Sequence, residues 1–169
     1  MKRLGLWRHA KSSWDDPSLG DIDRPLNDRG KRDAPRMALA MEEMGLHWDL
    51  VLCSPARRAW QSGAALVPAG ACVELVPALY LASATTLVAL IHALPDGKQS
   101  VLIIGHNPGL HDLAQRLTQN DSGAARKALA MKFPTAALAV IACKTAHWSD
   151  IAPGHCQLSH FVRPHDLKG

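Results

Sequence analysis

The side chains best suited to chemistry in this sequence are Arg8 and His9, which directly follow the short apolar run 4–7. A neutral imidazole can attack phosphorus as a nucleophile, and an adjacent guanidinium can hold the phosphoryl oxygens. An arginine–histidine pair also closes many ordinary surface strands. The pair therefore indicates phosphoryl chemistry only if further groups of the same kind lie beside it.

Two further polar segments follow buried strands predicted from the sequence. One reads S-P-A-R-R over residues 54–58, and the other reads G-H-N-P-G over residues 105–109. We expect each to lead into a helix, with Ser54 capping the first of these helices and Pro55 at its first position. Helix N-termini attract anions, which suits a site for phosphate.

These segments would meet at one edge of a parallel sheet, where ligands bind outside the carboxyl ends of the strands. We therefore expect one electropositive pocket formed by Arg8, His9, Arg57 and His106.

The elements that must position these residues alternate along the chain. Apolar runs predict strands, and apolar residues at helical spacing predict helices. The strands are expected at 4–7, 50–53, 73–76, 101–104, 137–143 and 157–162, and the helices at 28–44, from 56, at 87–94 and from 109. Continuous apolar strands separated by helices are typical of a sheet buried on both faces. We predict an α/β fold, a three-layer α/β/α sandwich with a mostly parallel central sheet, in one domain over residues 1–169.

The ends of the first long helix are marked by Asn27, a suitable N-cap, and by Gly45, a suitable stop. Pro35 lies inside this stretch. Proline removes a backbone hydrogen bond, so we expect it to kink the helix or to separate the first turn.

Composition limits the functional classes. The 169 residues carry a net charge of +4, with 47% hydrophobic and 20% charged residues, as in ordinary globular proteins. The basic residues are scattered, which argues against nucleic acid as a partner. The N-terminal sequence predicts neither a signal peptide nor a membrane span. The four cysteines are far apart and suggest separate thiols in a reducing compartment, so we expect a cytoplasmic monomer that does not bind membranes.

Several of these motifs together resemble the histidine phosphatase superfamily, which includes the phosphoglycerate mutases. Within it, the sequence is most similar to the small SixA-type phosphohistidine phosphatases. The segments that carry the resemblance are L-W-R-H-A, S-P-x-R-R-A, G-H-N-P-G, D-R-P-L-N-D-R-G at residues 23–30 and F-V-R-P at residues 161–164. They span nearly the whole chain, and the resemblance implies a phosphoglycerate mutase-like fold.

The resemblance also implies roles for the pocket residues. His9 would be the nucleophile and would form a phosphohistidine intermediate that water then hydrolyses. Arg8 and Arg57 would bind the phosphoryl oxygens, and His106 would stabilise the charge on them. Of the two adjacent arginines the superfamily motif matches Arg57, so Arg58 would point away from the pocket. No metal or other cofactor is needed. The implied substrate is a phosphohistidine in a signalling protein.

One feature of many superfamily members is missing. The stretch 76–83, where they carry a glutamate that protonates the leaving oxygen, has no acidic residue. An alkoxide needs that proton, whereas an imidazole with a pKa near ~6.5 leaves with less help. The sequence thus favours a phosphoramidate over an ester, in a shallow site that admits a protein side chain. Substitute acids are available, although each is more simply a solvated or capping carboxylate: Asp15, Asp16, Asp21, Asp23 and Asp112.

Four other interpretations stay open at this stage. Cys53 could begin a cysteine-phosphatase loop, but Ala59 stands where that loop needs an arginine. A metal hydrolase is suggested by nine histidines, but no metal-ligand spacing such as H-E-x-x-H is present. The chain could also be a phosphatase of a small phosphorylated metabolite. Finally, the same fold could bind phosphate or a phosphoprotein without catalysis.

Overall fold

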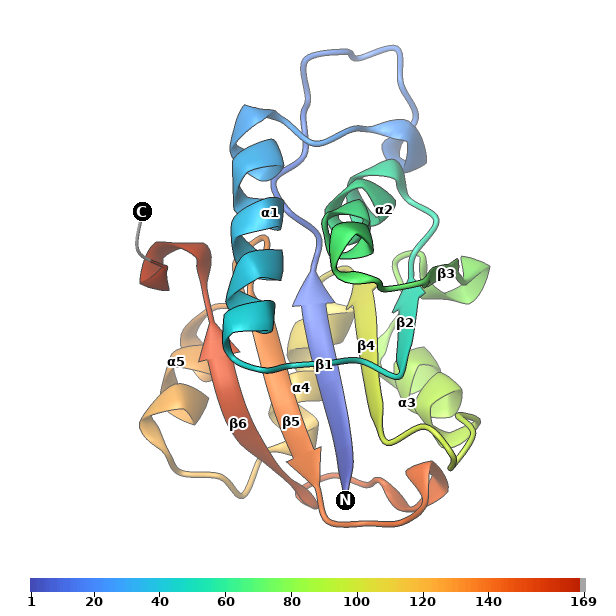
Figure 1. Cartoon of the computed structure of the whole chain (residues 1–169), viewed down its shortest axis with the longest axis vertical. Coiled ribbons are helices and arrows are strands. Elements are labelled where there is room, and N and C mark those ends of the chain that lie inside the picture. Colours follow the sequence, from blue (N-terminus) through green and yellow to red (C-terminus); the bar gives the residue numbers. More distant parts are fainter. Residues whose placement is uncertain (168–169) are drawn as a thin grey trace.

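The computed structural model of the chain describes residues 1–167. A six-stranded sheet of order β3-β2-β4-β1-β5-β6 forms its centre (Figure 1). Of these strands, only β5 runs opposite to the others. The strands are β1 (Lys2–Arg8), β2 (Leu50–Cys53), β3 (Val73–Leu75), β4 (Ser100–Gly105), β5 (Leu138–Cys143) and β6 (Cys156–Val162). The predicted mostly parallel sheet is confirmed.

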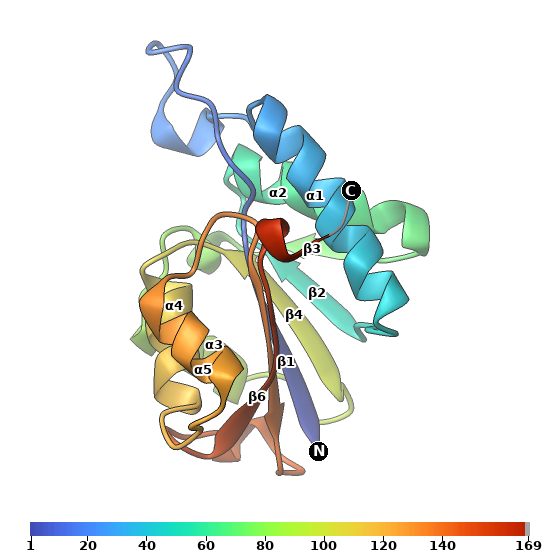
Figure 2. The same ribbon diagram turned by 90° about the vertical axis from the view of Figure 1, so that its left-hand side faces the viewer.

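Helices cover both faces of this sheet, as Figure 2 shows from the side. The helices α1 and α2 lie on one face, and α3, α4 and α5 lie on the other. Their bounds are α1 (Asp28–Glu43), α2 (Arg57–Gly63), α3 (Ala84–His92), α4 (Gly109–Leu117) and α5 (Ala124–Met131). The predicted three-layer α/β/α architecture is therefore confirmed.

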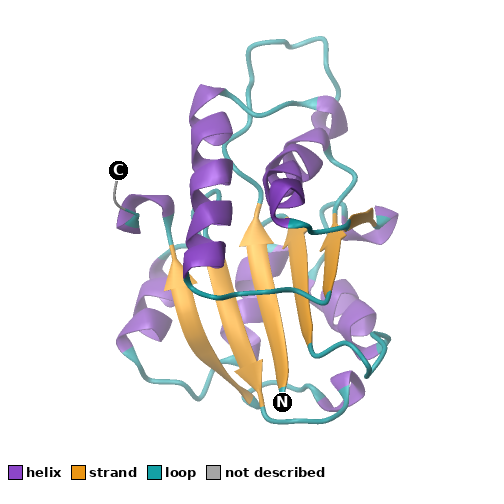
Figure 3. Cartoon of the chain, viewed as in Figure 1, coloured by secondary structure: helices purple, strands orange, loops and turns teal. Residues whose placement is uncertain are grey.

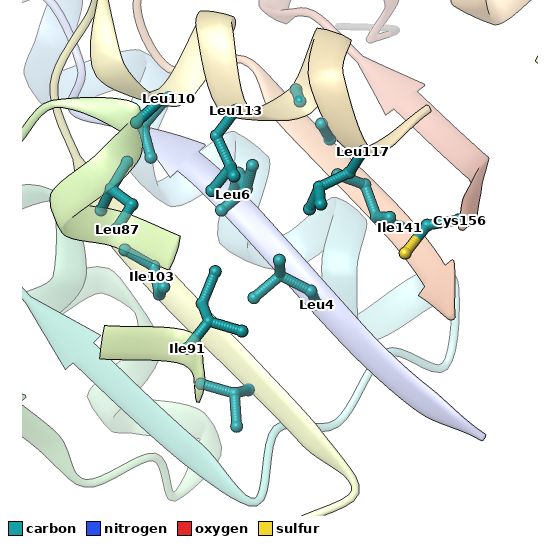
Figure 4. Close-up of a cluster of buried hydrophobic side chains, with 14 of the residues drawn as sticks. Leu4, Leu6, Leu87, Ile91, Ile103, Leu110, Leu113, Leu117, Ile141 and Cys156 are labelled. Carbon is teal, nitrogen blue, oxygen red and sulfur yellow. The ribbon is translucent and has the colours of Figure 1, made fainter. Parts of the chain in front are cut away.

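Two apolar cores result because successive side chains of a strand point to opposite faces. Leu4 and Leu6 of β1 face α3 and α4, where they meet side chains such as Leu87 and Leu113 (Figure 4). Trp7 of β1 belongs to the other core, with residues of α1 and α2. The sheet is thus anchored on both sides, and its strand ends are fixed relative to one another.

Helix α1 begins and ends close to the predicted residues. The Asn27 side chain accepts a hydrogen bond from the Gly30 amide at 2.9 Å, and Gly45 has a φ of +70°, which favours glycine. The expected break at Pro35 is wrong, because the helix is continuous through it. Pro35 and Lys31 are both exposed, so the Lys31 carbonyl, which loses its helical partner, faces water.

Helix α5 was not predicted from the sequence. Leu129 is the only buried side chain among its described residues, so the segment shows no apolar stripe. It packs against β6 and α4 and leads into the loop 132–137 beside the end of β1.

The cysteines also differ from the expectation of separate thiols. Cys143 and Cys156 are direct partners in the antiparallel β5–β6 register, and they form a disulfide. Cys53 and Cys72 are free. The cysteines therefore do not indicate a reducing compartment. Among the helices of residues 1–167, none has both the length and the apolar character needed to cross a membrane.

Candidate active site

The three strands that carry the predicted pocket residues are neighbours in the sheet. The order β2-β4-β1 brings the segments after their carboxyl ends to one edge, beneath a loop that projects between β1 and α1 (Figure 3). The His9 amide donates to the Gly105 carbonyl at 3.1 Å, and the Ser54 amide donates to the Ile104 carbonyl at 3.0 Å. The predicted convergence of the three segments is confirmed.

His9 is held as a neutral imidazole whose Nε2 carries the lone pair and accepts from Arg58 Nε. Its Nδ1 lies 2.7 Å from the carbonyl oxygen of Ala10, which can only accept, so Nδ1 carries the hydrogen and Nε2 has a lone pair. The residue is 7% exposed. Burial, assisted by the positive charges of Arg58 and Arg8, lowers the pKa of His9 to about 3. A ring in this state is a nitrogen nucleophile at neutral pH.

Arg58, and not Arg57, faces the histidines. The Arg58 Nε lies 3.4 Å from His9 Nε2, and its Nη2 lies 3.4 Å from His106 Nδ1. Arg58 is 3% exposed, whereas Arg57 is exposed. The expectation that Arg57 forms the pocket is therefore wrong. Helix α2 begins at Arg57, and neighbouring helical residues point about 100° apart, so only the second arginine is directed into the site.

Arg8 reaches the site from the end of β1. Its Nη1 donates to the Phe133 carbonyl at 3.1 Å, and the side-chain Nδ2 of Asn107 donates to the same oxygen at 2.9 Å. The Arg8 Nε is buried and makes no hydrogen bond within the described residues. Burial, with the nearby charge of Arg58, lowers the pKa of Arg8 from its ordinary value.

His106 packs against His9 with 5.2 Å between the ring centroids. Its Nε2 lies 2.7 Å from the Ser54 hydroxyl, and burial, together with the charge of Arg58, lowers its pKa to about 4. Ser54 therefore orients this imidazole. It is not the N-cap of α2 that we expected, because that helix begins later and its N-cap is Ala56.

Known proteins match this chain in sequence and in fold. Residues 4–80 match the sequence profile of the histidine phosphatase superfamily (branch 1). An uncharacterized protein of Mycobacterium tuberculosis is 34% identical over 160 residues, which cover 93% of this chain and 99% of that protein. The chain belongs to the histidine phosphatase superfamily.

Within this superfamily the chain is of the SixA type. The SixA structure from Agrobacterium tumefaciens is 30% identical, with a TM-score of 0.82 over 96% of this chain and 98% of that one. The SixA structure from Nakamurella multipartitia is 27% identical, with a TM-score of 0.85 over 96% of each chain. The protein histidine phosphatase SixA complexed with tungstate has the same fold, with a TM-score of 0.77 at 24% identity and 98% and 99% coverage. These likenesses support phosphatase activity.

Among the described residues, the carboxylates considered as substitute acids make no hydrogen bond or ion pair with the arginines and histidines of the site, with one exception. Asp15, Asp16, Asp23 and Asp112 are exposed, and the Asp16 carboxylate accepts hydrogen bonds from Ser18. Asp21 is the exception, because its carboxylate contacts Arg58 at 3.0 Å. Hydrogen bonding by Tyr80, assisted by Arg58 and Arg24, lowers the pKa of Asp21 to about 2. Asp21 is thus ionised at neutral pH and holds no proton to donate.

Tyr80 is a site residue that the sequence did not reveal. Its ring meets His106 edge-on, with 5.6 Å between the centroids, and its hydroxyl donates to the Asp21 carboxylate. Gly109, at the start of α4, allows the backbone of Ala82 to pack closely, because a Cβ there would collide with the Ala82 carbonyl. Tyr80 falls in the stretch where the superfamily's acid was sought, so a search for any polar side chain there would have found it.

Cys53 is unsuited to nucleophilic catalysis. It is fully buried, and burial raises the pKa of its thiol to about 12. The reactive form of cysteine is the thiolate, which this environment disfavours.

Proposed function

We propose that this chain is a phosphohistidine phosphatase that acts through a phosphorylated His9. The observation that carries the proposal is the orientation of His9, whose Nδ1–H is held by Ala10 while Nε2 faces Arg58 and the neighbouring imidazole. The site therefore offers a fixed lone pair on nitrogen, surrounded by groups that bind phosphoryl oxygens.

In the first step, His9 Nε2 attacks phosphorus as the bond from phosphorus to the substrate nitrogen breaks. A substrate imidazole that already carries a proton on its other nitrogen leaves in its neutral form, so the protein need not supply one. Arg8 and Arg58 then neutralise the phosphoryl oxygens through charge-assisted hydrogen bonds. No carboxylic acid is required, which agrees with the ionised state of Asp21.

In the second step, water attacks the phosphorus on His9 and the bond from phosphorus to Nε2 breaks. Inorganic phosphate and free His9 result, and the water's excess proton passes to phosphate or to solvent. His106 stabilises the oxygens in both steps. A bound phosphoryl dianion raises the pKa of a nearby histidine, so His106 becomes a better donor once the substrate is present.

The proposed substrate is a phosphohistidine side chain of a phosphotransfer signalling protein. The support for it is the leaving group: the Asp21 carboxylate, which contacts Arg58, is ionised, so the site is poorly equipped for an ester whose oxygen must be protonated. The SixA relatives point to the same substrate class.

The test compares kcat/KM for a histidine-phosphorylated phosphotransfer domain with kcat/KM for an aryl phosphate and a phosphorylated metabolite. We expect the phosphohistidine to be preferred by about 100-fold or more, because its leaving group needs no acid. A preference for either ester would overturn the substrate assignment. Binding of the phosphoprotein without turnover would instead identify a silent binding module.

A further inference from the structure

Asp21 contacts Arg58 at two points. Its backbone carbonyl accepts from Arg58 Nη1 at 2.7 Å, and its Oδ2 accepts from Arg58 Nη2 at 3.0 Å. The carboxylate side chain is 43% exposed and the Arg58 side chain is 4% exposed, so Asp21 lies on the solvent side of the guanidinium. The Nε of the same guanidinium lies 3.4 Å from His9 Nε2, and Nη2, which Asp21 also contacts, lies 3.4 Å from His106 Nδ1.

Asp21 is itself fixed by Arg24 of its own loop and by Tyr80 of the segment after β3. Its Oδ1 accepts from Arg24 Nη2 at 3.1 Å, and its Oδ2 also accepts from the Tyr80 hydroxyl. Arg24 is held in turn by the Ser12 hydroxyl at 2.8 Å and by the ring of Trp14, 3.5 Å from the guanidinium carbon. The loop between β1 and α1 and the segment after β3 thus meet on one carboxylate.

This arrangement determines which N–H groups of Arg58 are directed at a phosphoryl group. A guanidinium has five N–H donors in a rigid plane, so holding one edge fixes the orientation of the remainder. The described polar contacts of the Asp21 side chain are with Arg24, Arg58 and Tyr80, and none is with His9 or His106. Arg58 is therefore the hydrogen-bonded link from Asp21 to the two imidazoles. The Asp21 charge also raises the pKa of His106, and its partner Tyr80 meets the His106 ring.

We propose that Asp21 is a positioning residue. Through its backbone carbonyl and its carboxylate, it holds Arg58 in the orientation that binds the phosphoryl group. The proposal rests on the proposed function, since it assumes that Arg58 meets the phosphoryl group. It assigns to the loop after the nucleophile a role in ordering the site. That role differs from the proton donation for which its carboxylates were first considered.

The test is a double-mutant cycle of Asp21→Asn and Arg58→Ala, read on phosphohistidine hydrolysis. Asparagine keeps the shape and the backbone carbonyl but removes the charge. We expect Asp21→Asn alone to lower kcat/KM by about 10-fold or more. In the Arg58→Ala background, the same change should lower kcat/KM by less than about 2-fold, because the effects of residues in one network are not additive. Asp21→Glu should recover part of the loss. Asp23→Asn, an equal charge change at an exposed position of the same turn, should change kcat/KM by less than about 2-fold.

Tungstate affinity, measured by calorimetry on the same four proteins of the cycle, gives a second readout if Arg58→Ala turns over too slowly. An equal loss of activity or affinity in both backgrounds would overturn the positioning role, as would an Asp23→Asn effect as large as that of Asp21→Asn. The thermal unfolding midpoint of each variant identifies losses caused by misfolding. Failure of the proposed function looks different: His9→Asn would then retain activity, whatever the Asp21 variants do.

Discussion

One guanidinium links the two imidazoles of the site. Arg58 Nε lies 3.4 Å from His9 Nε2, and the same side chain reaches His106 Nδ1 at 3.4 Å. A cation that touches both rings disfavours their protonation, which adds to the effect of burial. The site is therefore neutral at its nucleophile and positive at its arginines, as an attack on an anionic phosphoryl group requires.

The two adjacent arginines of α2 provide a matched pair of variants. Arg58→Ala should lower kcat/KM by about 100-fold or more, because it removes buried donors aimed at the developing charge. Arg57→Ala should change it by less than about 3-fold, since Arg57 is exposed. Steady-state kinetics on one phosphohistidine substrate gives both values. The reverse order of effects would show that Arg57 is the functional arginine.

The protonation of the two site histidines can be followed by NMR of the ring nitrogens. Because the pKa is lowered to about 3 for His9 and about 4 for His106, both rings should be neutral at pH 5.5. His147, whose pKa is raised by its hydrogen bond with Asp96, should be protonated there. The nucleophilic form of His9 is thus lost only when pH falls toward 3. Titration of His9 near pH 6.5 would contradict this electrostatic description.

Bound tungstate should raise the pKa of His106, which burial lowers. A bound oxyanion adds negative charge beside the ring, so the midpoint of the His106 titration should move upward by a unit or so. The same NMR experiment with and without tungstate measures this shift. An unchanged midpoint in the saturated complex would show that His106 does not contact the anion.

Because the Asp21 carboxylate beside Arg58 is ionised, we predict a steep dependence on the leaving group. Across a series of aryl phosphates, kcat/KM should fall roughly fivefold or more for each unit by which the pKa of the leaving phenol rises. A donated proton would flatten this dependence. A shallow slope that becomes steep when one carboxylate is replaced would identify that residue as the missing acid.

The disulfide should affect stability and leave the reaction unchanged. Cys143 pairs with Lys2 at the start of β1, whereas His9 follows the end of that strand. Loss of the bond between residues 13 apart in sequence should cost about 3 kcal/mol of unfolding free energy. Denaturant unfolding of Cys156→Ala measures that cost, and thiol titration of the unfolded wild type should find two free thiols rather than four. A loss of kcat/KM in the folded variant would contradict the separation of the disulfide from the site.

The sequence predicts the sheet and the positions of Arg8, His9 and His106 well, because all three depend on where apolar strands end. The superfamily motif selects Arg57, whereas the arginine that points inward is decided by the first residue of α2, where a shift of one position exchanges the two side chains. Asp21 and Tyr80 depend on packing between segments far apart in the chain, which periodicity does not encode. The Cys143–Cys156 pair likewise depends on the β5–β6 register.

The most direct test of the account is to trap the phosphoenzyme. Acid quench of the protein during turnover of a ³²P-labelled phosphohistidine substrate, followed by peptide mapping under alkaline conditions, locates any phosphate bound to the protein. We predict an acid-labile phosphate on His9, formed in the wild type and lost in His9→Asn together with turnover. Turnover with no phosphate on His9, or undiminished turnover by His9→Asn, would contradict the central claim.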